Sequence, residues 1–386
     1  MDKSKWEYKK LGEVCTFISG LWVGKKPPYK EVGVIRNANF TKECQLRTDN
    51  IAVIEVEEKQ FDKKKLKKGD IIIEKSGGSD KQPVGRPVLF NLDGEYSFSN
   101  FTSALRIKEV VKLDPKFLHK CLASYYFAGA TKAMQSKTTG LHNLDLKMYK
   151  NQLIPIIPIS IQQSIVSELD QLSAIISLKQ QQMKEYDALA QSLFYEMINN
   201  ATSIDKKKLK DICEYSKGRY DASKLTVDNY VGVENLLKNC QGKRQASTLG
   251  KILSATAYKK GDVLIGNIRP YLRKIWLATN DGGASGDVLV IRINNEYTNK
   301  IDPLFLYSAL AQDDFFIYDN THTKGVKMPR GDKKEIMNYS IPLPPLSLQR
   351  SFAEKVKAIE HQKSLLKQSI AETQTLLDSR MQEYFG

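Results

Sequence analysis

Apolar residues recur every three or four positions through residues 158–200, a segment with no glycine and no proline after its first residue. The positions in this series are Ile165, Leu169, Leu172, Ile176, Met183, Tyr186, Ala190, Leu193 and Met197, with Lys179 as a polar interruption. Such a narrow stripe at heptad spacing predicts a helix that packs along a partner helix. At about 1.5 Å per residue the helix would be roughly 55 Å long, so a second long helix is needed to cover the stripe.

That second helix is predicted at the C-terminus, where residues 345–386 repeat the first segment at a shift of 187 positions. The corresponding apolar positions are Phe352, Val356, Ile359, Leu366, Ile370, Leu377 and Tyr384, interrupted by Lys363, Thr373 and Arg380. The match continues upstream of both helices, where Asn151, Ile154 and Pro155 correspond to Asn338, Ile341 and Pro342. Periodicity alone does not produce those identities, so we predict two related helices that pair with each other.

The segments between the helices also repeat, with the same order of short stretches and different spacers. The stretches are Leu11–Cys15 with Leu209–Cys213, Lys67–Ile73 with Lys259–Ile265, Leu105–Ile107 with Ile291–Ile293, and Leu113–Leu118 with Ile301–Leu306. The chain is therefore predicted to be a pseudo-two-fold tandem duplication. Its expected parts are a first domain at 1–157, a central helix at 158–200, a second domain at 201–343 and a C-terminal helix at 344–386.

Each domain is predicted to be α/β, of the mixed α+β kind with short strands. Runs of β-branched and apolar residues between turn residues predict strands at 51–56, 70–74, 88–90 and 104–107, and at 262–265, 275–278 and 288–293. Asp114 and Asp302 each precede a proline, which is typical of an N-cap followed by the first helical residue. The helices that follow are expected at 115–128 and 303–318.

The formal net charge of +15 lies almost entirely outside the two long helices. Residues 158–200 carry two lysines against five acidic residues, and residues 344–386 carry six basic against five acidic residues, so the rest of the chain holds a net +17. A basic surface on two ordinary globular domains favours a polyanionic partner, with nucleic acid first. The alternative is that the charge serves only solubility.

The length of the chain and its cysteines indicate how many domains to expect and which kinds of protein are less favoured. A chain of 386 residues accommodates two domains with connecting elements. It has no apolar run of about 18 residues that would predict a membrane span, and its first ten residues lack the apolar core of a secretory signal. The cysteines, Cys15, Cys44, Cys121, Cys213 and Cys240, form no CxxC pair, which argues against a metal site and fits the cytoplasm.

Three short stretches imitate catalytic motifs without completing them. Residues 26–29 resemble an amino-methyltransferase motif, but charged Lys26 cannot accept the hydrogen bond that the first position needs. Residues 20–25 are one spacer short of a phosphate-binding loop, and chance explains the nuclease-like Glu57–Lys59 in a chain rich in Glu and Lys. The histidines, His119, His142, His322 and His361, lack metal-ligand spacing. We therefore expect a binding protein with no catalytic residue and no metal ligand.

The chain resembles the specificity subunit of type I restriction-modification enzymes. The resemblance covers essentially all residues and rests on the order domain, helix, domain, helix, with support from residues 6–14, Lys67–Ile71, Pro342–Pro345 and Gln349. It implies two target-recognition domains separated by two long helices, which pair as an antiparallel coiled coil. Each domain would read one half of a bipartite DNA site. Because paired helices would hold the domains at a fixed separation, an unspecified spacer is expected between the two halves.

The resemblance also implies partners. They are double-stranded DNA, two copies of an adenine methyltransferase subunit and a motor-endonuclease subunit. No cofactor is expected on this chain, because S-adenosylmethionine, ATP and Mg would belong to the partner subunits. The outer faces of the helices are the expected docking surface, with Ile175, Leu178, Phe194 and Leu365 as apolar candidates that could instead widen the helix–helix core. A competing class is a tandem-domain adaptor that binds proteins on a coiled-coil rod, and salt-dependent binding to duplex DNA would separate the two.

Two loops in each domain carry the residue types that DNA recognition needs. Arg, Lys, Asn and Gln read base edges, whereas basic, hydroxyl and backbone N–H groups contact phosphates. The candidates in the first domain are Lys75, Ser76, Ser79, Lys81, Gln82, Arg86, Lys137, Thr138 and Asn143. Those in the second domain are Arg219, Asn267, Arg269, Tyr271, Arg273, Lys274, Lys324, Lys327 and Arg330. Lys137 and Lys324 are favoured as phosphate contacts, Arg36, Asn37 and Arg219 are weaker candidates, and each side chain could instead only solvate its loop.

Overall fold

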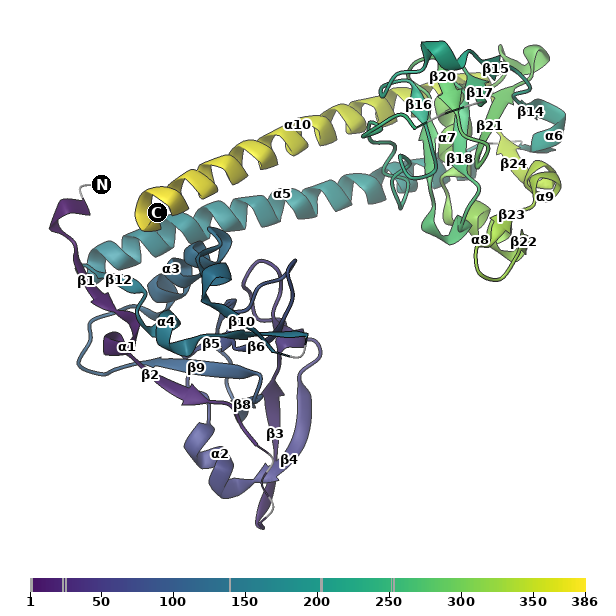
Figure 1. The fold of residues 1–386 in the computed structure, drawn as a ribbon. Helices are drawn as coiled ribbons and strands as arrows, with labels where there is room; N and C mark the ends of the chain where they lie inside the picture. Colours follow the sequence, from purple (N-terminus) through teal and green to yellow (C-terminus); the bar gives the residue numbers. More distant parts are fainter. Residues whose placement is uncertain are drawn as a thin grey trace. The chain divides into compact units, whose positions relative to one another are not determined.

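The computed structural model describes residues 3–22, 24, 26–138, 140–201, 204–250, 252 and 254–386 (Figure 1). The chain forms two compact units. Unit 1 comprises Met1–Lys179 with Ser369–Gly386, and unit 2 comprises Gln180–Gln368. Each unit therefore combines one globular part with half of each long helix.

Unit 1 is built around short, mostly antiparallel sheets. Its central sheet has the order β2 (Cys15–Ser19), β9 (Thr102–Ile107), β5 (Ile71–Glu74), β7 (Pro87–Leu89). The other sheets are β4 (Ala52–Glu57) with β3 (Tyr29–Ile35) and β8 (Tyr96–Phe98), β10 (Gln135–Thr138) with β11 (Leu141–Leu144) and β6 (Ser76–Gly78), and β1 (Glu7–Lys10) with β12 (Leu153–Ile156). The helices of the globular part are α1 (Leu11–Val14), α2 (Glu58–Lys64), α3 (Pro115–Phe127) and α4 (Leu146–Lys150).

Unit 2 repeats this plan. Its central sheet has the order β14 (Cys213–Tyr215), β21 (Val288–Ile293), β18 (Val263–Gly266), β19 (Ile275–Leu277). The other sheets are β15 (Arg219–Tyr220) with β17 (Ala255–Tyr258), β20 (Gly282–Ala284) and β16 (Tyr230–Val231), β22 (Thr323–Lys324) with β23 (Arg330–Gly331), and β13 (Asp205–Lys208) with β24 (Ser340–Leu343). The helices are α6 (Leu209–Ile212), α7 (Pro303–Leu310), α8 (Asp313–Thr321) and α9 (Lys333–Asn338). The two central sheets have the same topology, which confirms the predicted duplication.

A buried ion pair explains why the Lys-Lys-Gly-Asp stretch and the later Arg recur together. In unit 1, Asp70 accepts hydrogen bonds from the side chain of Arg106 at 2.8 and 2.6 Å and from the Lys67 amide at 2.8 Å. In unit 2, Asp262 does the same with Arg292 at 3.0 and 2.6 Å. The aspartate therefore closes the turn and joins neighbouring strands of the central sheet.

The predicted helix at 115–128 is confirmed, but the one predicted at 303–318 is two helices. As expected, Asp114 and Asp302 cap α3 and α7 by accepting hydrogen bonds from backbone amides. α7 ends at Leu310 and α8 begins at Asp313. Arg273 stabilises the break, because its side chain donates to the Ala311 carbonyl at 3.2 Å and pairs with Asp313 at 2.6 Å.

The two long helices lie within the predicted segments 158–200 and 344–386, with α5 at Ile159–Asn199 and α10 at Leu346–Phe385 (Figure 1). All of the predicted stripe positions are buried or half-buried. Polar interruptions find partners on the other helix. In unit 1, Lys179 donates to the Ser369 and Thr373 hydroxyls at 2.7 and 3.0 Å. Nearer the start of α5, Glu168 pairs with Arg380 at 3.0 Å, so the helices run antiparallel.

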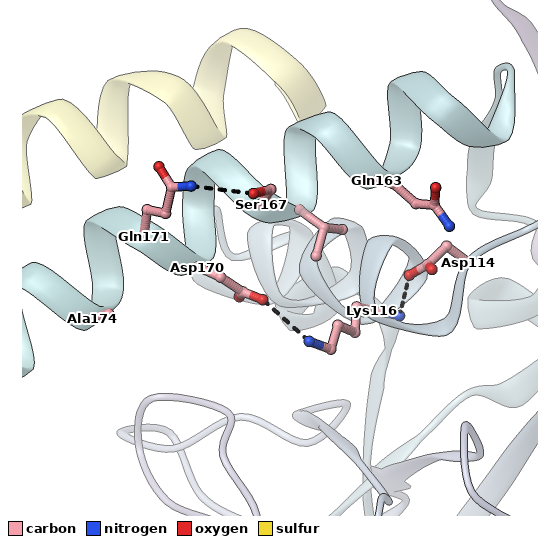
Figure 2. Close-up of a pocket in the computed structure, with 8 residues that line it drawn as sticks. Asp114, Lys116, Gln163, Ser167, Asp170, Gln171 and Ala174 are labelled. Carbon is pink, nitrogen blue, oxygen red and sulfur yellow. Dashed lines mark hydrogen bonds and ion pairs between the residues drawn. The ribbon is translucent and has the colours of Figure 1, made fainter.

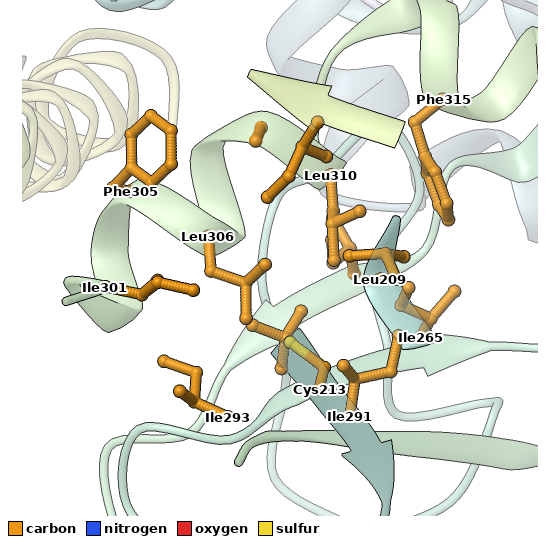
Figure 3. Packing of buried hydrophobic residues seen from close by; sticks show 14 of the residues in the cluster. Leu209, Cys213, Ile265, Ile291, Ile293, Ile301, Phe305, Leu306, Leu310 and Phe315 are labelled. Carbon is orange, nitrogen blue, oxygen red and sulfur yellow. The ribbon is translucent and has the colours of Figure 1, made fainter. Parts of the chain in front are cut away.

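The same antiparallel pairing holds in unit 2. Lys363 of α10 lies 2.7 Å from Asp187 of α5, and the rings of Phe194 and Phe352 have centroids 5.8 Å apart. Phe194 also stacks on Phe305 at 6.0 Å, within the core shown in Figure 3. Phe194 is only 4% exposed, so of its two candidate roles it widens the buried core and is not an exposed docking residue.

One fully buried glutamine fastens each long helix to its domain. Gln162 accepts a hydrogen bond from the Asp114 amide at 2.7 Å and donates to the Ile157 and Lys112 carbonyls at 2.7 and 3.1 Å. Gln349 makes the equivalent contacts in unit 2, accepting from the Asp302 amide at 2.9 Å. The helix start and the N-cap of α3 or α7 are therefore held as one assembly.

Candidate nucleic-acid interface

The two candidate loops of unit 1 meet in a single three-stranded sheet, β10-β11-β6. Asn143 of β11 is in register with Ser76 of β6, and the Ser76 hydroxyl donates to the Asn143 side chain. Reciprocal backbone hydrogen bonds of 2.8 and 3.1 Å between Ser79 and Gln82 close a tight turn, where Lys81 is exposed. Residues about 60 positions apart in sequence therefore share one surface, which we call the reading sheet of unit 1 (residues 76–78, 135–138 and 141–144).

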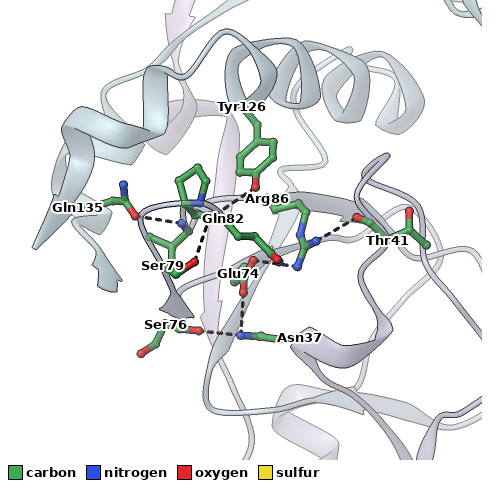
Figure 4. Close-up of polar contacts among 11 residues, drawn as sticks. Asn37, Thr41, Glu74, Ser76, Ser79, Gln82, Arg86, Tyr126 and Gln135 are labelled. Carbon is green, nitrogen blue, oxygen red and sulfur yellow. Dashed lines mark hydrogen bonds and ion pairs between the residues drawn. The ribbon is translucent and has the colours of Figure 1, made fainter. Parts of the chain in front are cut away.

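A buried polar network supports this sheet (Figure 4). Asn37 donates to the Glu74 carboxylate at 3.1 Å and to the Ser76 carbonyl at 2.7 Å. Arg86 pairs with Glu74 at 3.2 Å and donates to the Thr41 carbonyl at 3.2 Å. Burial raises the pKa of Glu74, and Arg86 offsets part of that rise.

Arg86 and Asn37 are consequently corrected from DNA contacts to supports of the sheet. Arg86 is only 3% exposed and its guanidinium faces Glu74. Gln82 lies over Arg86. When the side-chain amide of Gln82 is oriented with its oxygen toward Arg86, this oxygen accepts hydrogen bonds from the two terminal guanidinium nitrogens at 2.7 and 3.0 Å. The sequence does not show this burial, because Glu74 and Thr41 are distant from Arg86 along the chain and contact it only in the folded structure.

Unit 2 brings its two loops together in the same way. Ile268 forms an antiparallel bridge with Arg330, and the Arg269 amide donates to the Pro329 carbonyl at 2.7 Å. The β22–β23 hairpin thereby joins the loop that follows β18. The exposed candidates on this surface are Arg269, Tyr271, Lys324, Lys327 and Arg330. Lys324 pairs with Asp332 at 2.6 Å and Arg330 with Asp287 at 3.1 Å, so both cations are oriented by carboxylates.

Three candidates of unit 2 are corrected because their side chains serve the fold. Asn267 is buried. Arg273 holds the break between α7 and α8, and Lys274 donates to the Val233 carbonyl while burial lowers its pKa. Lys274 corresponds to Arg86, because the Gly266 amide donates to the Lys274 carbonyl as the Glu74 amide does to the Arg86 carbonyl. Each unit thus anchors the end of its loop with a basic side chain.

The remaining candidates have different placements. Lys75 and Ser76 are half-buried at the start of the unit 1 loop. Lys137 and Thr138 lie in β10, but their side chains are outside the described residues. Arg219 is exposed in β15, which belongs to the sheet of β17 and not to the hairpin. The structure therefore does not place Arg219 with the other candidates.

Sequence analysis missed two exposed aromatic residues of unit 1, Trp22 and Phe101, of which Phe101 adjoins the reading sheet. The amides of Lys75 and Ser76 both donate to the Phe101 carbonyl, at 2.9 and 3.0 Å. Phe101 and Trp22 are exposed although aromatic residues usually indicate a core position. The sequence signal for their exposure is their position in turns, because Trp22 closely follows Gly20 and Phe101 follows Ser99 and Asn100.

No pocket or metal cluster marks an active site in the part of the chain that the structure describes. A shallow cavity of about 580 Å³ in unit 1 is lined by residues of α5 and of the start of α3, among them Asp114, Lys116 and Asp170, and by none of the candidate DNA-binding residues (Figure 2). The described residues contain no group of three or more His, Cys, Asp or Glu side chains placed to hold a metal ion. They also contain no helix that is long and apolar enough to cross a membrane.

The fold and these surfaces define a class of protein with tandem α/β domains joined by antiparallel long helices. In each domain, two loops that are far apart in sequence pair with each other to form one surface. Residues 3–186 and 203–374 match the family described as the type I restriction modification DNA specificity domain, and the chain belongs to that family. The predicted resemblance is therefore confirmed, as is the fold class.

Individual relatives are distant. The chain is 28% identical over 99 residues to the type I restriction enzyme EcoDI specificity subunit of Escherichia coli, covering 26% of this chain and 21% of that protein. It is 24% identical over 255 residues to the MjaVIII specificity subunit of Methanocaldococcus jannaschii, covering 59% of this chain and 60% of that protein. A solved structure from work on complex assembly and conformational transition of the type I R-M system matches with a TM-score of 0.60 at 18% identity, over 98% of this chain and 97% of that one.

Proposed function

We propose that this chain is the DNA-recognition subunit of a type I restriction-modification system and binds a bipartite duplex site. The observation that carries the proposal is that both units join the same two loops into one surface, with different exposed side chains on each. Unit 1 presents Ser79 and Lys81, whereas unit 2 presents Arg269, Lys327 and Arg330. One scaffold with two sets of side chains suits the reading of two different half-sites, by domains at 1–157 and 201–343.

The charge supports DNA as the ligand. The chain carries a net +15, and the charge lies outside the long helices. Side chains such as Arg330, held by Asp287, match the oriented bidentate donors that read guanine in the major groove. Lysines at the loop tips match phosphate contacts.

In this proposal the chain is not itself an enzyme. Two adenine methyltransferase subunits with S-adenosylmethionine, and a motor-endonuclease subunit with ATP and Mg, would supply the chemistry. The names of the curated relatives, specificity subunits of type I restriction enzymes, support such an assembly. The five cysteines are all free thiols, in keeping with work in the reducing cytoplasm.

The long helices would carry the partner subunits. Ile175 and Leu178 on α5 and Leu365 on α10 are exposed apolar side chains next to the buried stripe. In unit 1, α5 also lines a shallow cavity through Gln171 and Ala174 (Figure 2). Exposed apolar side chains on a helix fit a protein–protein contact better than a DNA contact.

Binding of the purified chain to duplex DNA tests the proposal. We expect selection from a random duplex pool to return two constant blocks with a spacer of fixed length. The logarithm of the affinity should fall linearly with the logarithm of the salt concentration, since phosphate contacts release counterions. Binding that ignores salt, or a pool that yields no constant blocks, would contradict the proposal and favour a protein-binding adaptor.

A further inference from the structure

Unit 1 exposes two large aromatic side chains on neighbouring segments. Trp22 is 67% exposed and Phe101 is 46% exposed, whereas Trp276 is buried and Trp6 is half-buried. An aromatic ring carries a large apolar area, and a cluster of such area left in water often marks a binding surface. We call Trp22 and Phe101 the aromatic patch.

Backbone contacts bring the two residues together. Leu21 forms a parallel bridge with Ser99, and its amide donates to the Phe98 carbonyl at 2.8 Å. Trp22 is therefore the residue after this bridge on one segment, and Phe101 lies two residues after it on the other. Glycine makes the approach possible, because a Cβ on Gly20 would lie 1.9 Å from the Ser99 carbonyl oxygen.

The patch borders the unit 1 reading sheet and two basic side chains. The Phe101 carbonyl accepts hydrogen bonds from the amides of Lys75 and Ser76, at the start of β6 in the reading sheet. Lys64 donates to the Gly20 carbonyl at 2.7 Å. Burial, with a smaller contribution from the charge of Lys75, lowers the pKa of Lys64. Apolar rings are thus flanked by positive charge.

Unit 2 has different chemistry at the equivalent position. The Asn267 amide donates to the Asp287 carbonyl as the Lys75 amide donates to the Phe101 carbonyl, so Asp287 replaces Phe101. Asp287 pairs with Arg330 on the hairpin. The position therefore holds an aromatic ring in one unit and an ion pair in the other, although the surrounding backbone is shared.

We propose that Trp22 and Phe101 pack against the apolar surface of DNA bases at one base step of the half-site read by unit 1. This inference rests on the proposed DNA-binding function. Aromatic rings flanked by basic side chains hold base faces while the cations meet the phosphates, and apolar wedges can part a base step in duplex DNA. Lys64 and Lys75 would contact the adjoining phosphates, and β6 would face the base edges.

Affinity measurements with the full chain test this contact, using a duplex that the chain selects from a random pool. Trp22→Ala and Phe101→Ala should each raise the Kd by about 5- to 100-fold, as loss of one base–aromatic contact does. Trp22→Phe should retain most of the affinity. Tyr8→Ala is the matched control, because Tyr8 is also an exposed aromatic but lies in β1, on another sheet. Unchanged thermal melting shows that the variants are folded.

Fluorescence distinguishes a direct DNA contact by Trp22 from a purely structural role, because only a direct contact would shield the ring when DNA binds. The difference between the wild-type and Trp22→Phe spectra isolates the emission of Trp22. On addition of the selected duplex, this emission should become protected from acrylamide. Tight binding with unchanged acrylamide quenching and an unchanged Kd for Trp22→Ala would overturn the inference and leave the proposed function standing. Failure of the wild-type chain to select any duplex would overturn both.

Discussion

At the residue scale, basic side chains in the loops divide into those that face solvent and those that hold the loop. Arg86 and Lys274 occupy equivalent positions, and both are directed inward to a backbone carbonyl of a distant segment. Lys81 and Arg269, close to them in sequence, are exposed. A positive charge in a DNA-binding loop therefore does not by itself identify a DNA contact.

Arg86→Ala should destabilise unit 1 by about 3–5 kcal/mol, because it leaves the buried Glu74 carboxylate without its cation. Replacing both partners, as in Glu74→Leu with Arg86→Met, should restore most of that loss. Urea unfolding measures both effects. Lys81→Ala is the control and should leave stability unchanged while weakening DNA binding. If Arg86→Ala reduced DNA affinity without any loss of stability, Arg86 would be a direct contact after all.

Asp319 is the carboxylate through which we expect the stability of unit 2 to depend on pH. Its carboxylate oxygens are buried without a hydrogen-bond partner among the described residues, and burial raises its pKa from 3.8 to about 6, slightly offset by His322. Because the folded-state pKa is the higher one, the stabilising effect of the proton is complete below about pH 4 and is lost as pH rises through 6. A rise of about two pKa units corresponds to about 3 kcal/mol.

Asp319→Asn should therefore stabilise unit 2 at pH 7.5, by up to about 3 kcal/mol, and have little effect at pH 4. Thermal or urea unfolding across pH 4 to 8 would show the difference. Tyr215 and Asp332 are the other titratable groups nearby, since Asp319 and Asp332 both raise the pKa of Tyr215. An equal effect of the substitution at both pH values would show that Asp319 does not titrate in this range.

At the element scale, Gln162 and Gln349 decide how each long helix leaves its domain. Each side chain satisfies three backbone groups that are otherwise buried, at the helix start and at the N-cap of α3 or α7. The proline-rich segment before each helix cannot supply these donors itself. The glutamine side chain thus supplies hydrogen bonds to backbone groups that would otherwise have no partner.

Gln162→Ala should lower the unfolding free energy of unit 1 by about 2–3 kcal/mol, since unsatisfied buried backbone groups carry a desolvation cost. The neighbouring Gln163→Ala is the matched control, because Gln163 is exposed and should change stability little. Chemical denaturation of the two variants makes the comparison. Similar stabilities for both variants would mean that the three hydrogen bonds are replaced by water without cost.

At the scale of the whole molecule, the sequence predicted the parts whose signal is periodic or repeated. The positions of α5 and α10 follow from heptad spacing, and the duplicated sheets follow from repeated stretches such as Lys67–Ile73. It did not predict the meeting of the two loops in each unit, the inward turn of Arg86, or the break at Ala311, which Arg273 stabilises. Those features depend on contacts between residues far apart in the chain.

Deletion of one heptad from each long helix tests whether the paired helices set the spacer. Removing residues 172–178 of α5 and 372–378 of α10 takes out segments that face each other, as Lys179 faces Thr373. At about 1.5 Å per helical residue and about 3.4 Å per base pair, the preferred spacer should shorten by roughly three base pairs. An unchanged spacer would contradict a fixed-length connection.

The central claim is that each unit reads its own half of a bipartite DNA site. The most direct measurement is to map methylated adenines in a genome that carries this chain with its methyltransferase partner, for the wild type and for Arg330→Ala. The account predicts two specific blocks with a constant spacer, and relaxed specificity in only one block for the variant. A single continuous motif, or a change in both blocks when only unit 2 is altered, would contradict it.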